Sequence, residues 1–363
     1  MSSTSHKAEE WLYKAVKLNP RNFDAWTVLG HCLWAKGQLA QAKNCFLTSL
    51  EQTENAEALR QLSMIVRQIQ QKNVDPATIL EESIRYAKRS IELEPTNHKS
   101  WYVLGNAHCT KFFSVSHDML DLKKSLICYE KSEGFGGSIN PDLYYNRGNV
   151  LRYMQEYDAA VSAYRRAATI DPNIEQTHES IEEIREFVTR TRDLVNTGGK
   201  LKKKKLSTLT TQLLDEIKPN AVGPTTLPLG SDLRALGCGV GEVQSSSPTR
   251  NFVGTSIAVK VVMAVTKGSV PPESFLCVDS RGSFVVVSVY NLAMNGASQF
   301  NTDETVVIVD PAVKDVYFTG LADSPELFFS VVQVTQLEKI SVGGKFLNRA
   351  GIAAPTLSVD VFE

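Results

Sequence analysis

The first half of the chain repeats with a period of 34 residues, and this periodicity restricts the fold more than any other feature. Ala42 lies 34 positions after Ala8, and Phe46 lies 34 positions after Leu12. Around these residues the apolar side chains recur every three or four positions, which is typical of amphipathic helices. A unit of this length holds two helices and a turn. We therefore expect a stack of helix pairs that bury a continuous core between neighbours.

The residues within each unit match the tetratricopeptide repeat (TPR), whose pattern is W-x2-L-G-x2-Y…A-x3-F…P. The best copy runs from Tyr144 to Pro172, and another begins at Trp101. Small residues at fixed positions let the paired helices approach, while large apolar residues fill the space between them. The matching positions of the first clear repeat are Trp26, Leu29, Gly30, Leu33, Ala42 and Phe46.

The array is expected to begin within a repeat and to end in a closing helix. Residues Ala8 to Pro20 match a second helix that no first helix precedes, so we expect an N-terminally incomplete array. The alternative is that Trp11 and Tyr13 cap the array in an unconventional way. After Pro172, apolar residues at helical spacing predict a long helix that stops at the glycine pair 198–199.

The second half has the period of β-strands. From Thr255 onward, short runs rich in Val, Ile, Phe and Tyr alternate with turn signals such as DSRGS and VGGK. About five strands in roughly 110 residues predict a small closed barrel, and the OB-fold fits best. We expect a multidomain α + β protein: an N-terminal all-α TPR superhelix with a closing helix, and a C-terminal all-β OB-fold barrel. The expected domains are a TPR domain at 1–197, a basic and then Ser/Pro/Gly-rich linker at 198–250, and an OB-fold domain at 251–363.

Composition restricts the possible functions. The formal net charge is −1, and the barrel region has seven basic and eleven acidic residues, so the barrel alone is a poor candidate for nucleic-acid binding. The six cysteines form no metal-binding pattern, which indicates a reduced intracellular protein. No catalytic or cofactor motif is present, and no run of roughly 18 apolar residues could cross a bilayer. We therefore predict a non-enzymatic, cofactor-free monomer without a membrane partner, located in the cytoplasm or also in the nucleus.

Charged and amide side chains on the first helices of the repeats are the candidate peptide-binding residues. Arg67 with Asp142 and Glu175 would suit a short peptide that carries both charge signs. Asn106 and Asn149 occupy equivalent positions and could hold peptide backbone through bidentate amide bonds. The alternative is structural: Asp142 would only cap its helix, and Arg67 would only be solvated.

Several strings together resemble the tetratricopeptide repeat protein five (Strap) family. They are QLSMIVRQIQ, SWYVLGNAH with the insertion after it, NPDLYYNR, CVDSRGSFVVVSVYN and GKFL. The resemblance runs from about residue 8 to the end and is weakest between Thr210 and Thr249. It implies a cytosolic factor of tubulin autoregulation. Such factors recognise the Met-Arg-Glu N-terminus of nascent α- and β-tubulin at the ribosome, and trigger decay of the translated mRNA through an adaptor and a deadenylase complex.

The resemblance also implies roles for particular residues. The peptide-contacting arginine of the family falls on Arg67 and its acidic partners on Asp142 and Glu175, although the pairing with the peptide stays open. The lysines that contact ribosomal RNA near the exit tunnel fall within the run Lys202, Lys203, Lys204 and Lys205, with Lys202 and Lys204 the best matches. By composition alone, this run could equally be a solvated linker or a nuclear import signal. Two other functions therefore stay open: a TPR scaffold that acts as a stress-responsive transcription cofactor, and a solenoid whose barrel binds RNA.

Overall fold

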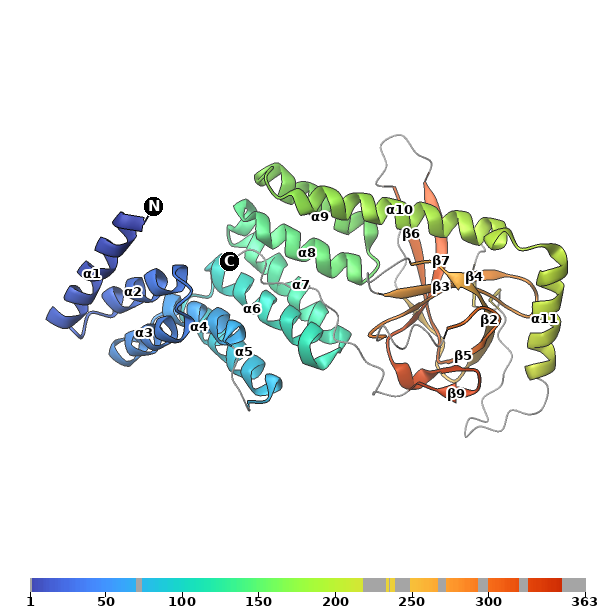
Figure 1. The fold of residues 1–363 in the computed structure, drawn as a ribbon, viewed down its shortest axis with the longest axis horizontal. Coiled ribbons are helices and arrows are strands. Elements are labelled where there is room, and N and C mark those ends of the chain that lie inside the picture. The colour runs from blue at the N-terminus through green and yellow to red at the C-terminus, as the bar shows by residue number, and fades with distance from the viewer. Residues whose placement is uncertain are drawn as a thin grey trace. The chain divides into compact units, whose positions relative to one another are not determined.

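The computed structural model describes residues 2–69, 74–217, 233–234, 236–238, 249–266, 272–292, 300–319 and 326–347 (Figure 1). The described chain forms two compact units, the first up to Arg147 and the second from Gly148 to Leu347. Helices alone make up the described part of the first unit, and the second combines helices with a curled sheet. The predicted fold class, a helical TPR array followed by an all-strand barrel, is confirmed.

Antiparallel helix pairs build the first unit. Five of its helices begin after an Asn or Asp whose side-chain oxygen accepts a backbone N–H, which satisfies a donor that the helix itself leaves open. These capping residues are Asn22, Asn55, Asp75, Asn97 and Asp118. The helices are α1 (Ser2–Leu18), α2 (Phe23–Ala35), α3 (Leu39–Gln52), α4 (Ala56–Gln68), α5 (Pro76–Leu93), α6 (His98–Lys111), α7 (Met119–Gly134) and α8 (Pro141–Tyr153), which continues into the second unit.

Glycine allows the two helices of a pair to touch. A Cβ atom on Gly30 of α2 would lie 2.5 Å from the Phe46 ring of α3, and one on Gly105 of α6 would lie 2.6 Å from the Tyr129 ring of α7. Both rings are fully buried. The TPR glycine therefore makes room for a large aromatic side chain of the partner helix, as the repeat pattern predicts.

The insertion after α6 is packed into the first unit. It forms a π-helical turn, Phe112–Ser116, in which Phe112 and Phe113 are buried. Asp121, at the start of α7, accepts a hydrogen bond from the Ser116 hydroxyl (2.7 Å) and lies 3.1 Å from Nδ1 of His108. The insertion between α6 and α7 thus makes its own apolar and polar contacts.

Glu57 of α4 gathers three donors, and we expect it to make the array sensitive to acid. His31 and Arg60 hold the pKa of this carboxyl well below its ordinary value of 4.5, so its contribution to stability is present above that value and is lost as pH falls below it. Because the carboxylate is 36% exposed, we expect a loss of only about 1 kcal/mol. Glu57→Gln should be less stable than the parent at pH 7, and this difference should shrink below pH 4.5 in urea titrations followed by circular dichroism. A pH-independent difference would contradict the prediction.

Helices also open the second unit. They are α9 (Tyr157–Ile170), α10 (Glu175–Thr197), a 3-10 turn (Gly198–Lys200) and α11 (Lys203–Ile217). The closing helix predicted after Pro172 is α10, and it ends where the glycine pair begins. Within the segment predicted as a linker, the lysine run leads into the helix α11, whose Leu209 and Leu213 are buried.

The strands form an OB-type barrel. They are β1 (Arg250–Asn251), β2 (Ser256–Ala264), β3 (Glu273–Val278), β4 (Phe284–Val289), β5 (Thr305–Val309), β6 (Ala312–Phe318), β7 (Leu327–Val334), β8 (Ile340–Val342) and β9 (Lys345–Phe346). β2, β3 and β4 form an antiparallel meander, and β4 pairs in parallel with β7. β5 pairs with β2, and β6, which follows after only Asp310 and Pro311, pairs with β7. The bent β5–β6 segment therefore closes the sheet.

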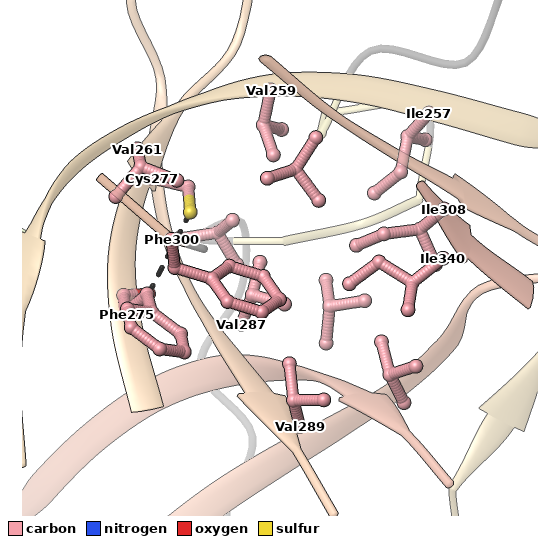
Figure 2. Close-up of a cluster of buried hydrophobic side chains, with 14 of the residues drawn as sticks. Ile257, Val259, Val261, Phe275, Cys277, Val287, Val289, Phe300, Ile308 and Ile340 are labelled. Carbon is pink, nitrogen blue, oxygen red and sulfur yellow. Dashed lines mark hydrogen bonds between the residues drawn. The ribbon is translucent and has the colours of Figure 1, made fainter. Parts of the chain in front are cut away.

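Apolar side chains fill the barrel (Figure 2). Val259, Phe275 and Ile308 come from three different strands and point into one cluster. The Phe275 and Phe300 rings stack with centroids 4.4 Å apart. The rings of Phe275 and Phe300 therefore pack inside the barrel core.

The α8–α9 connection and α11 both contact the barrel inside the second unit. Gln155 donates to the Ser288 hydroxyl (2.9 Å) and accepts from the Tyr290 hydroxyl (3.1 Å). On the face of β2, the buried ammonium group of Lys260 lies 2.7 Å from Glu216 of α11. Because a buried ammonium group is stabilised by such a partner, this ion pair helps to hold α11 on the strand.

Candidate functional site

Arg67 lies near the end of α4 and is half-buried. Its Nε donates to the carbonyl oxygen of Ser63 (3.2 Å), and its Nη1 donates to the Thr110 hydroxyl of α6 (3.0 Å). Thr110 in turn donates to the carbonyl oxygen of Asn106 (2.9 Å). The guanidinium group is therefore oriented by two helices rather than merely solvated, and orientation of this kind lowers the entropic cost of binding a carboxylate.

Asn106 is buried, and its side-chain oxygen is already occupied. This oxygen accepts from the Tyr129 hydroxyl (2.8 Å) and from Nδ2 of Asn146 (3.2 Å), which also lies 3.2 Å from the Tyr102 hydroxyl. Only the amide nitrogen of Asn106 is left to bind peptide backbone, so the bidentate use predicted from the sequence would require these bonds to rearrange.

Asn149, in the second unit, repeats this arrangement. Its side-chain oxygen accepts from the Tyr164 hydroxyl (2.7 Å), and the preceding residue, Gly148, faces the same ring. A Gly-Asn pair on one helix thus meets a tyrosine of the next helix in two repeats. In the sequence, the signal for this fixed amide orientation is a Gly-Asn pair followed by a tyrosine on the next helix.

The two acidic candidates each lie in the first turn of a helix. Asp142 is half-buried at the start of α8, but the capping oxygen belongs to Asn140, which accepts the N–H groups of Asp142 (3.0 Å) and Leu143 (3.4 Å). Glu175 is exposed at the start of α10, which has no side-chain cap. Capping therefore does not account for Asp142. In the first unit, Arg67 and Asn106 share one hydrogen-bond chain, while Asn149 and Glu175 belong to the second unit.

The lysine run forms a compact cationic surface at the start of α11. Lys202, Lys203 and Lys204 are exposed, whereas Lys205 pairs with Asp303. The first turn of α11 has no acidic residue. Since a helix N-terminus carries partial positive charge and favours anions, lysines at this position destabilise the helix slightly and concentrate positive potential.

Free thiols and possible metal-binding side chains are the other reactive groups of the described residues. The six cysteines are free thiols, and burial raises the pKa of Cys45 and Cys128 to about 11, so these thiols stay protonated at neutral pH. Within the described ranges, no group of three His, Cys, Asp or Glu side chains could hold a metal ion. None of the helices described is long and apolar enough to cross a membrane.

A TPR array joined to an OB-fold barrel defines the class of this chain: a scaffold for protein interactions. Family models agree, since two TPR models match residues 23–55 and 141–174, and the Tetratricopeptide repeat protein 5 OB fold domain matches residues 251–355. The chain is 30% identical to Tetratricopeptide repeat protein 5 of Bos taurus over 373 residues, covering 98% of this chain and 80% of that protein. The protein of that name from Mus musculus is 29% identical with the same coverage, and the one from Homo sapiens is 32% identical over 80% of this chain and 66% of that protein.

This chain therefore belongs to the tetratricopeptide repeat protein 5 family. The family membership inferred from the sequence strings is confirmed, with relatives that match both the repeats and the barrel.

Proposed function

We propose that this protein is a ribosome-associating factor that recognises the Met-Arg-Glu N-terminus of nascent α- and β-tubulin in its TPR array. Recognition would trigger co-translational decay of tubulin mRNA through an adaptor that recruits a deadenylase complex. The observation that carries the proposal is the half-buried Arg67 guanidinium, which Ser63 and Thr110 orient on the helix where the family resemblance places the peptide-binding arginine.

The chemistry of the peptide suits these side chains. An oriented guanidinium binds a carboxylate through two parallel N–H···O bonds, so Arg67 fits the peptide glutamate. The carboxylates of Asp142 and Glu175 fit the peptide arginine, and each lies in the first turn of a helix, where the helix dipole favours its ionised form. Binding alone performs this function, so the protein needs neither a catalytic group nor a cofactor.

The exposed lysines support the ribosome contact. The positive charges of Lys202, Lys203 and Lys204 repel the positive N-terminal end of α11. Bound RNA phosphates would offset this repulsion. Lys205 is engaged by Asp303, which favours the first three lysines as the RNA-binding residues. Action on nascent chains places the protein in the cytoplasm.

Replacing Lys202, Lys203 and Lys204 by alanine should lower cosedimentation with ribosomes that carry tubulin nascent chains by about tenfold at 0.15 M salt. Cosedimentation of the intact protein with ribosomes should also decrease as the salt concentration is raised. Free Met-Arg-Glu peptide should reduce the capture of ribosomes that carry tubulin nascent chains and should not affect the capture of other ribosomes. The matched control removes three exposed lysines elsewhere, Lys99, Lys123 and Lys345, and should cosediment like the parent. Equal capture by both triple variants would contradict the proposal.

The same exposed lysines also fit a nuclear import signal, and this supports the second candidate, a TPR scaffold that acts as a transcription cofactor under stress. If the protein has that function, the variant with alanine at Lys202, Lys203 and Lys204 should no longer accumulate in the nucleus, and its cosedimentation with ribosomes should stay unchanged. Measuring both quantities on the same variant distinguishes the two functions.

A further inference from the structure

A hollow of 810 Å³ lies among α4, α5, α6 and α7 of the first unit, and its lining does not include Arg67, Thr110 or Asn106. Its apolar floor includes Ile84, which is largely buried, and the buried imidazole of His108 borders it. Its other lining residues include four cationic side chains from α5, α6 and α7: Arg85, Lys88, Lys111 and Lys124.

Within the part of the chain that the structure describes, none of these four cations forms an ion pair with a carboxylate. Arg89, at one edge of the hollow, differs, because Glu54 (2.5 Å) and Glu92 (2.7 Å) neutralise it. One further carboxylate, Glu81, also lines the hollow. Outside the Arg89 cluster the lining therefore carries four cations and one carboxylate, a net positive surface that an anionic ligand would complement.

Two of the amines, those of Lys88 and Lys124, act on His108. Nδ1 of His108 lies 3.1 Å from the carboxylate of Asp121. Burial is the main cause that lowers the pKa of this imidazole, and the positive charges of Lys124 and Lys88 lower it further. These lysines are therefore close enough to His108 to repel its protonated form. A carboxylate bound among them would gain from the same field.

Apolar side chains continue the surface beside the hollow. Leu120 and Ile127 precede and follow Lys124 by four and three positions on α7, which places all three on one stripe of the helix. Leu120 is 51% exposed and Ile127 is 52% exposed. A small inorganic anion would leave this stripe uncovered, whereas a peptide with apolar residues would cover it.

We propose that this hollow binds an acidic, amphipathic segment of a protein partner. Its carboxylates would lie against Lys88, Lys111 and Lys124, and its apolar side chains would cover Ile84 and the Leu120–Ile127 stripe. The site is distinct from the Arg67 site, so one chain can hold two peptides of different chemistry. This gives the scaffold a second docking point on the first unit.

The test uses the whole chain and a fluorescein-labelled Glu-Glu-Leu-Leu-Glu-Glu peptide, with anisotropy as the readout. We expect binding that weakens with salt, and a loss of about tenfold or more when Lys88→Glu and Lys124→Glu are combined. The matched control is Lys123→Glu, an exposed neighbour on α7 that does not line the hollow, and it should change the affinity less than about twofold. Circular dichroism shows whether each variant is folded.

Three outcomes would overturn the proposal. They are an equal loss for Lys123→Glu, equal binding of the peptide with glutamine in place of glutamate, and tighter binding of a labelled oligouridine that the double substitution abolishes. Arg67→Ala should leave binding of the acidic peptide unchanged, and a parallel loss would show that the hollow is not a separate site. If the double variant is unfolded, Lys124→Ala alone should still weaken binding by about threefold.

Discussion

Replacing Arg67 by alanine should weaken binding of a Met-Arg-Glu peptide by about 30-fold or more, which corresponds to at least ~2 kcal/mol. The side chain is half-buried and receives its orientation from Ser63 and Thr110, so the substitution removes an arranged charge rather than a mobile one. The peptide glutamate would then be left without a partner in a partly desolvated site. Isothermal titration calorimetry with the free peptide measures the effect.

Two companion variants make the Arg67 result specific. Thr110→Val keeps the shape of the residue but removes the hydroxyl that accepts from Arg67, and it should weaken binding by about fivefold. Arg21→Ala removes an exposed arginine of the same unit and should bind like the parent protein. If Arg67→Ala keeps both its helical content and the parental affinity, the assignment of the peptide site is wrong.

Replacing Gly198 by alanine should destabilise the second unit by about 2–4 kcal/mol. Gly198 ends α10 with a φ of 59°, and its N–H bonds to the carbonyl oxygens of Leu194 and Val195. A side chain in this left-handed conformation costs about 1 kcal/mol by itself. The added Cβ would also lie 2.5 Å from the Phe284 ring of β4, and such overpacking costs about 1–3 kcal/mol more.

Gly254→Ala separates these two contributions. Gly254 also has a positive φ, 76°, but among the described residues beyond its chain neighbours no atom lies within 4 Å of the position that its Cβ would take. The Gly254→Ala variant should therefore lose only about 1 kcal/mol of unfolding free energy, the cost of a side chain in the left-handed conformation. Differential scanning calorimetry of the whole chain compares both variants. Equal shifts would show that the contact between the end of α10 and the barrel is not tightly packed.

The fold was largely predictable because its signals are local. The 34-residue period and the Gly30–Phe46 pairing specify helix pairs, and the alternating apolar runs specify strands such as β2 and β4. α11 was not predicted, because the lysine run at its start resembles a solvated linker. Its helical state depends on Leu209 and Leu213, whose apolar surface is buried only when the second unit is folded.

The candidate site was predictable in its residue types but not in its geometry. The sequence by itself determined the repeat register, the family, and the positions of Arg67, Asp142 and the lysine run, because each depends on residues that are close together along the chain. The tertiary structure alone decided that Tyr129 occupies the oxygen of Asn106, that Thr110 orients Arg67, and that Lys88 and Lys124 border one hollow. Asn106 and Tyr129 are 23 positions apart in the sequence, and Arg67 and Thr110 are 43 positions apart. Only the packing of the helices brings these side chains within hydrogen-bond distance.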